Sequence, residues 1–132
     1  MKHDTKRQER LKNANEFIKC ISSCGRNFFA YKDDLCFFEL DQRGRVWFTD
    51  AYSKKKIYTH YEGRWKGFTH GGTLKSFVSA IKDYIVFDHK LNYYYFNDKS
   101  PELSHPWGYQ EDMKKVLDCG IKIGIIDKKP TG

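Results

Sequence analysis

The sequence of 132 residues contains no long apolar run and only four cysteines. Because a membrane-spanning helix needs about 20 predominantly apolar residues, the chain is not expected to cross a membrane. The first ten residues carry charges with no apolar block behind them, so no secretory signal is expected either. Internal repeats, low-complexity tracts and a convincing linker are also missing, which predicts a single domain over residues 1–132.

The cysteines are Cys20, Cys24, Cys36 and Cys119. They are too scattered for the disulfide framework of a small secreted domain, and we interpret them as reduced thiols in a cytoplasmic protein. Cys20 and Cys24 are four residues apart on a predicted helix, but no His or Cys pair with ligand spacing follows them. We therefore predict no metal site and no cofactor, and expect the cysteines to be buried as small apolar residues.

Motifs for catalysis are equally scarce. The sequence has neither the Walker nor the Rossmann pattern of glycines. Asp50, His60 and His70 are the side chains that a small nuclease-like site would use, but their spacings are unrelated and strand alternation separates them. The sequence therefore does not predict an enzyme, and a small nuclease-like activity is the alternative.

Large aromatic side chains are abundant, with ten Phe, nine Tyr and three Trp residues. Each can bury about 150 to 250 Å², so a few large side chains can build the core. Apolar residues recur at helical spacing over about residues 5–23 and again over about 73–87. In the second helix the apolar stripe contains Leu74, Phe77, Val78, Ile81, Tyr84 and Ile85.

Between these two helices the pattern changes to short aromatic and β-branched runs separated by turn residues. Such runs predict strands at residues 28–31, 35–40, 45–50, 56–61 and 64–68. The expected fold is therefore α+β, with an antiparallel meander of four to five strands packed on the helix at about 73–87. Towards the C-terminus we expect a strand at 91–96, a short helix at 110–119 and a final strand at 121–126.

The order of a sheet meander and an amphipathic helix, over about residues 28–87, resembles the layout of AP2-type DNA-binding domains. With the first helix included, the order is also similar to double-stranded-RNA-binding domains. Those domains carry a lysine cluster at the start of the last helix, which is reduced here to Lys75. Both resemblances concern element order alone, and no contact residue is transferred from either family.

Positive charge is concentrated between Arg43 and Lys75. This stretch has eight basic and two acidic residues, a local balance of +6 in a chain whose formal net charge is +7. Concentrated positive charge attracts polyanions, and the aromatic rings between these basic residues can stack on bases. The stretch therefore predicts a nucleic-acid-binding protein, with DNA preferred over RNA. The alternative is a protein–protein interaction module that binds an acidic protein surface, such as a virus- or mobile-element-type inhibitor or adaptor acting on a cytoplasmic partner.

Alternation along the strands separates a core face from an open face. Val46, Phe48, Ile57 and Tyr61 are expected under the second helix, with Trp65 also inward. The opposite face would then be both basic and aromatic, with Thr49 and His60 on it. The predicted nucleic-acid-binding residues are Arg43, Arg45, Trp47, Lys54, Lys55, Lys56, Tyr58, Arg64 and Lys66.

This face could bind a duplex groove or stack on the bases of a single strand. A purely structural role is the alternative to both binding modes. Trp47 and Tyr58 could shield the sheet as cross-strand partners, or the C-terminal segment could cover them. The lysines at 54–56 are equally typical of a solvated turn that protects a sheet edge.

A second candidate site is the start of the helix at about residue 73. Gly71, Gly72, Thr73 and Lys75 could bind a phosphate there, since free backbone N–H groups and the helix dipole favour an anion. An ordinary turn followed by an N-terminal cap explains the same residues.

Overall fold

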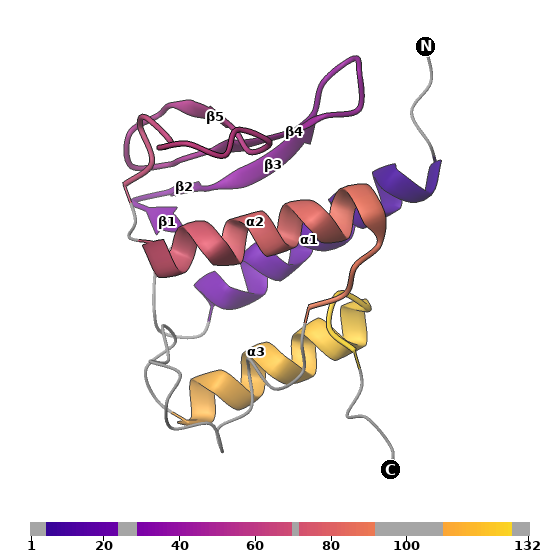
Figure 1. The fold of residues 1–132 in the computed structure, drawn as a ribbon. Coiled ribbons are helices and arrows are strands. Elements are labelled where there is room, and N and C mark those ends of the chain that lie inside the picture. Colours follow the sequence, from indigo (N-terminus) through magenta and orange to yellow (C-terminus); the bar gives the residue numbers. More distant parts are fainter. Residues whose placement is uncertain (1–4, 24–28, 70–71, 92–109, 128–132) are drawn as a thin grey trace.

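The computed structural model describes residues 5–23, 29–69, 72–91 and 110–127 (Figure 1). Its helices are α1 (Thr5–Ser22), α2 (Gly72–Phe87) and α3 (Gln110–Ile123). Its strands are β1 (Ala30–Tyr31), β2 (Asp34–Leu35), β3 (Phe37–Leu40), β4 (Val46–Thr49) and β5 (Lys56–Tyr58). These elements confirm the predicted α+β class and the positions of the first two helices.

The strands form two small antiparallel sheets rather than one meander. β1 pairs with β2 alone, and the second sheet has the order β3-β4-β5. The predicted strand at 35–40 is divided at Cys36, whose N–H donates to the carbonyl oxygen of Phe29 at 2.7 Å. The predicted strand at 64–68 is wrong, since these residues form no strand and turn at Gly67, which has a φ of 89°. Only glycine adopts such a φ readily.

The two long helices bury the residues that the sequence pattern selected. In α1 the buried positions are Ala14, Phe17, Ile18 and Ile21, and in α2 all six residues of the apolar stripe are buried. Arg7 and Arg10 of α1 donate to the carbonyl oxygens of Val86 and Ile85, at 3.3 and 3.0 Å. These bonds supply positive charge at the C-terminal end of α2, where the helix dipole favours it.

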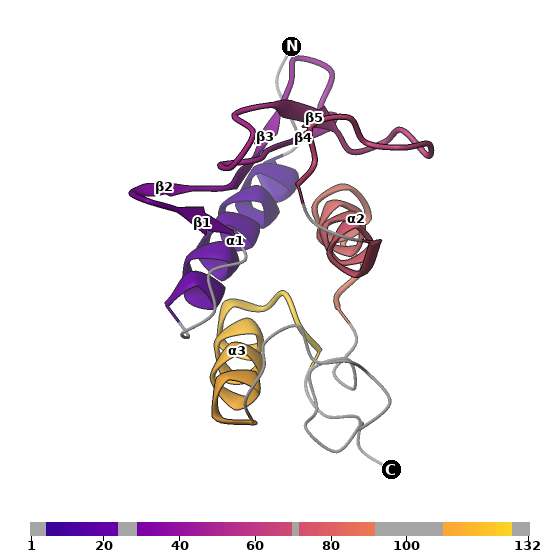
Figure 2. The ribbon, with the colours of Figure 1, turned by 90° about the vertical axis from the view of Figure 1, so that its left-hand side faces the viewer.

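The elements stack in layers (Figures 1 and 2). The sheet lies over α1 and α2, and α3 lies beneath α1, on the side of the helices away from the sheet. One face of the sheet therefore packs on the helices. Over the other face, the outer face, no described part of the C-terminal segment lies.

The C-terminal strand predicted at 121–126 is wrong. α3 continues to Ile123, because Ile121 follows Leu117 at helical spacing and both pack against the core. Beyond the helix, Ile126 makes one parallel bridge with Leu91. The remainder of the strand predicted at 91–96 lies outside the described residues.

The interpretation of all four cysteines as reduced thiols is also wrong. Cys20 of α1 and Cys119 of α3 form a disulfide with their Cα atoms 6.7 Å apart, so a covalent bond joins the two helices. Cys20 and Cys119 are therefore not the reduced thiols on which the expected cytoplasmic location was based. Cys36 is a buried free thiol, as expected, and burial raises its pKa to about 11. Cys24 lies outside the described residues.

Candidate nucleic-acid interface

The outer face of the β3-β4-β5 sheet is built by alternation along β4. Val46 and Phe48 are fully buried against the helices, while Trp47 between them is half-buried on the outer face. The register places Trp47 opposite Tyr58 of β5, with ring centroids 5.0 Å apart. The prediction that these two rings share one face, with Ile57 in the core, is confirmed.

Asp41, in the turn between β3 and β4, fixes the position of Trp47. Its Oδ2 accepts the indole N–H of Trp47 at 3.0 Å and the side chain of Arg45 at 3.1 Å. Its Oδ1 accepts the backbone N–H groups of Arg43 and Arg45, both at 2.9 Å. The Trp47 hydrogen bond, with these further donors, holds the pKa of Asp41 well below its ordinary value. Asp41 is therefore ionised at neutral pH and partly neutralises the cations around it.

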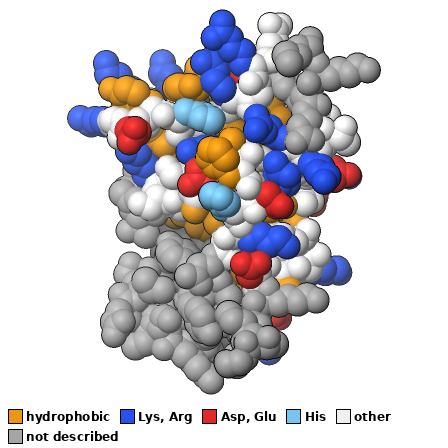
Figure 3. Space-filling view, turned by 45° about the vertical axis from the view of Figure 1, so that its right-hand side comes forward, with side chains coloured by type: hydrophobic (Ala, Val, Ile, Leu, Met, Phe, Trp, Pro, Cys, Tyr) orange, Lys and Arg blue, Asp and Glu red, His pale blue; other side chains and the backbone are white. Residues whose placement is uncertain are grey.

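Several predicted binding cations already have an acidic partner. Lys56 lies 3.4 Å from Glu39, Arg45 pairs with Asp41, and Lys54 pairs with Asp34. Lys56 and Arg45 also lie over the rings of Trp47 and Tyr58, each at 5.4 Å. These ion pairs make the field on the outer face weaker than the count of lysines and arginines suggests. On the side of the molecule that Figure 3 presents, basic side chains are also interspersed with acidic ones.

The other predicted binding cations are exposed and have no ion pair with a described residue. They are Arg43, Lys55, Arg64 and Lys66. Arg43 occupies the turn after β3, and Lys55 precedes β5. Arg64 and Lys66 differ from these two because they line a pocket.

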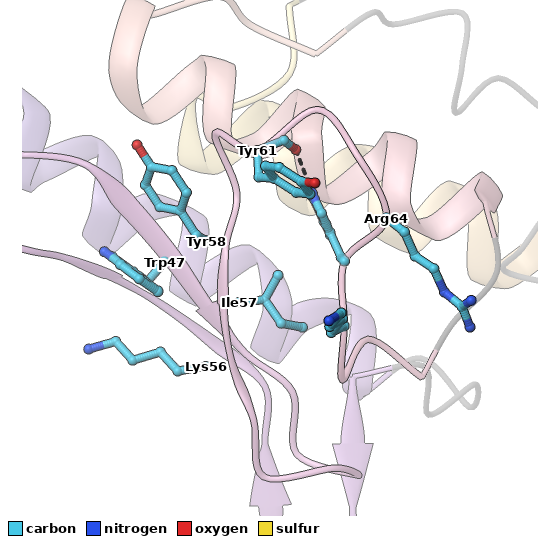
Figure 4. A pocket seen from close by; sticks show the side chains of 8 residues that line it. Trp47, Lys56, Ile57, Tyr58, Tyr61 and Arg64 are labelled. Carbon is cyan, nitrogen blue, oxygen red and sulfur yellow. Dashed lines mark hydrogen bonds between the residues drawn. The ribbon is translucent and has the colours of Figure 1, made fainter.

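This pocket lies along β5, which is an edge strand of its sheet, and has a volume of about 410 Å³. Figure 4 shows Lys56, Trp47 and Tyr58 on one side of the β5 segment, with Tyr61 and Arg64 on the other side. Neither Asp nor Glu is among the described residues that line it. The lining residues are Trp47, Lys56, Ile57, Tyr58, Tyr61, Arg64, Trp65 and Lys66.

Tyr61 was predicted to face the core, and this prediction is wrong. Its side chain is 58% exposed and lines the pocket. The physical reason is that β5 ends at Tyr58 and the chain turns at Thr59 and His60, so strand alternation does not extend to Tyr61. Trp65 does turn inward, as predicted, and is 5% exposed. Sequence reasoning missed Tyr61, Trp65 and Ile57 as pocket residues because each was assigned to the core.

Lys75, a candidate phosphate ligand, is engaged elsewhere. Its ammonium donates to the carbonyl oxygen of Gly63 at 3.0 Å and lies 5.1 Å from the ring centroid of Trp65. This side chain therefore connects α2 to the loop that forms the pocket. Gly71 lies outside the described residues. Gly72 and Thr73 belong to α2, but their surroundings are outside what the structure describes.

The side chains considered for catalysis have structural contacts. Asp50 is fully buried and accepts the backbone N–H groups of Tyr52 and Thr69, each at 2.8 Å, and the Thr69 hydroxyl. His60 Nε2 accepts the N–H of Val46 at 3.0 Å. Burial and the nearby positive charges of Lys82 and Arg45 lower the pKa of His60. His70 lies outside the described residues, and the described part of the chain contains no cluster of His, Cys, Asp or Glu suited to a metal ion.

None of the described helices has the length and apolar character needed to cross a bilayer. Searches of curated proteins and of solved structures found no match to this chain. A family model named YoqU matches residues 4–131, which is nearly the whole sequence. The chain therefore belongs to the YoqU family.

Proposed function

We propose that this protein binds nucleic acid, DNA in preference to RNA, at the pocket along β5 and the adjoining outer face. The observation that supports the proposal is the lining of the pocket, which combines four aromatic rings with three cations. Cations attract phosphates, and rings stack on bases. A cytoplasmic location is part of this proposal, and it rests on the nucleic-acid ligand, because the argument from reduced cysteines fails for Cys20 and Cys119.

Arg64 and Lys66 are the proposed phosphate ligands. Both are exposed beside the pocket, without an ion pair to a described residue. Lys56 also lines the pocket, but it would first have to leave Glu39, 3.4 Å away. Arg45 would similarly have to leave Asp41. Lys56 and Arg45 are therefore expected to contribute less to the binding energy than Arg64 and Lys66.

The experiment is a titration of fluorescently labelled DNA and RNA with the protein between about 50 and 200 mM salt. Binding should weaken with salt, because each neutralised phosphate releases counterions. The double variant R64Q/K66Q should bind more weakly and lower the slope of log K against log salt by roughly 1.4 on a single strand, since each contact contributes about 0.7.

The matched control is K114Q/K122Q, which removes the same charge from exposed positions of α3. This variant should retain the salt slope of the unmodified protein. Equal effects of the two double variants would assign the binding to net charge alone, and unchanged binding by R64Q/K66Q would contradict the proposed site. Tighter binding of RNA would contradict the preference for DNA.

A second candidate function is binding to an acidic protein surface, as a small inhibitor or adaptor would do. Tyr31 and Tyr52, both 38% exposed, support it because their ring centroids lie 4.9 Å apart with Lys32 and Lys54 close to the Tyr31 ring. Tyrosine is enriched among binding hot spots, and the two ammonium groups would attract an acidic partner surface. After nuclease treatment, a pull-down should recover one dominant protein with the unmodified chain and lose it with Y31S/Y52S.

A further inference from the structure

The loop from Tyr61 to Trp65, which forms one side of the pocket, is closed by hydrogen bonds. The indole N–H of Trp65 donates to the carbonyl oxygen of Tyr61 at 2.8 Å, drawn as the dashed line in Figure 4. Lys75 of α2 donates to the carbonyl oxygen of Gly63, in the middle of the loop. Contacts within the loop and from α2 therefore hold it in one shape before any ligand arrives, which lowers the ordering cost of binding.

Gly63 provides the space in which the Tyr61 ring lies. A Cβ atom at position 63 would stand 2.7 to 2.8 Å from Cε2, Cζ and the hydroxyl oxygen of Tyr61, closer than real contacts allow. The phenol end of the ring therefore rests directly on the backbone of Gly63. More than half of the side chain nevertheless remains open to solvent.

The other three rings of the pocket are less available. Trp47 has Lys56 over its ring and donates to Asp41. Tyr58 has Arg45 over its ring and stacks on His60 at a centroid distance of 5.3 Å. Trp65 is almost completely buried. Tyr61 is therefore the ring of the pocket with the most surface free for a new stacking partner.

The form of nucleic acid follows from this geometry. Stacking on a side chain requires an exposed base face, and the bases of an undistorted duplex keep their faces inside the helical stack. The pocket volume of about 410 Å³ lies within the roughly 300 to 1,000 Å³ of sites that enclose small organic molecules. It suits one nucleotide rather than a duplex, because a base can stack on the Tyr61 ring only when it lies outside a helical stack.

We propose that the pocket takes an unpaired nucleotide of a single strand, with its base stacked on Tyr61 and neighbouring phosphates on Arg64 and Lys66. This inference rests on the proposed nucleic-acid binding and narrows it to single strands. It also moves the stacking role from Trp47 and Tyr58, which the sequence suggested, to Tyr61.

The test compares one DNA sequence as a single strand and as a duplex, with a single-stranded RNA of the same sequence, at one salt concentration. The single strand should bind more tightly than the duplex. Y61A should weaken single-strand binding by about 5- to 150-fold, the measured range for loss of one stacked base. Y61F keeps the ring and should bind like the unmodified protein, and so should F87A, which removes an equally exposed aromatic ring outside the pocket.

The two proposals fail in different ways. Duplex binding as tight as single-strand binding, or unchanged binding by Y61A while R64Q/K66Q still weakens it, would overturn the unpaired-nucleotide site and leave nucleic-acid binding in place. Absence of binding to all three probes by the unmodified protein would overturn both proposals.

Discussion

The indole nitrogen of Trp47 donates a hydrogen bond of 3.0 Å to Asp41, which joins the outer face of β4 to the turn before it. The same carboxylate accepts the backbone N–H groups of Arg43 and Arg45 in that turn. Because these donors favour the charged form, the pKa of Asp41 lies well below its ordinary value. The charge on Asp41 therefore stabilises both the turn and the orientation of Trp47.

Replacing Asp41 with Asn should lower the free energy of unfolding by about 1 to 2 kcal/mol at neutral pH, because charge-assisted hydrogen bonds are lost. The pKa of Asp41 is lower in the folded state than its ordinary value of 3.8. Its stabilising effect is therefore present above that pH and is lost as the pH falls through the folded-state pKa. Urea unfolding should show a constant difference between the two proteins down to about pH 5 and a shrinking one below. A difference that grows toward acid pH would contradict this role.

His60 should make the stability depend on pH in the weakly acidic range. Its pKa in the folded state lies below the ordinary value of 6.5, and its neutral Nε2 accepts the N–H of Val46. The unfolded state therefore takes up a proton first as the pH falls below 6.5, and stability decreases until the folded-state pKa is passed.

The replacement H60Q should remove this pH dependence, because the glutamine side chain does not titrate. Its cost at neutral pH should be about 1 kcal/mol or less, since the amide oxygen can still accept a hydrogen bond. Thermal unfolding at several pH values checks the prediction, with H89Q as the control because His89 is exposed. If H60Q and the unmodified protein lose stability equally toward acid pH, the pH dependence comes from groups other than His60.

Reduction of the Cys20–Cys119 disulfide should destabilise the protein. The bond closes a loop with a sequence separation of 99 residues, and disulfides typically contribute about 2 to 4 kcal/mol. A reducing agent should therefore lower the midpoint of thermal unfolding of the unmodified protein and leave C20S/C119S unchanged. Replacement of Cys36 by Ala serves as the control, because Cys36 is a free thiol and this variant should keep its response to reductant. Equal midpoints with and without reductant would show that the bond does not stabilise the fold.

Replacing Gly63 with Ala should weaken nucleic-acid binding while the fold is kept. The added methyl group would collide with the Tyr61 ring end, which can swing away into solvent, so the free energy of unfolding should change by less than about 1 kcal/mol. Binding should fall because Tyr61 leaves its position in the pocket.

A double-mutant cycle separates this effect from general damage. G63A should add no further loss of affinity in the Y61A background, because the ring that it displaces is already absent. Additive losses would mean that Gly63 acts on binding by some route other than Tyr61.

Periodicity predicted the core well where elements are regular. Val46, Phe48 and Ile57 are buried because strand alternation holds through β4 and β5, and the stripe of α2 is buried because helical spacing holds to Tyr84 and Ile85. Trp47 and Tyr58 were placed on one face for the same reason.

The candidate site was harder to predict because it lies where that regularity ends. After β5 the hydroxyl of Thr59 donates to the carbonyl oxygen of Val46 at 2.6 Å, and the chain turns, so alternation could not place Tyr61. The ion pair between Lys56 and Glu39 depends on the register in which the strands pair, and a count of charges along the sequence does not reveal that register. The Cys20–Cys119 bond depends on how α3 packs on α1, which local pattern does not reveal.

The most direct test of the proposed binding site is an NMR titration of the labelled protein with a short single-stranded DNA, followed through its backbone and indole N–H signals. The predicted result is that the shifts cluster at Trp47, at residues 56–58 and at residues 61–66, while residues 114–127 of α3 and its C-terminal extension keep their positions. Shifts confined to α3, or no shifts at DNA concentrations that saturate binding in the fluorescence titration, would contradict a nucleic-acid site beside β5.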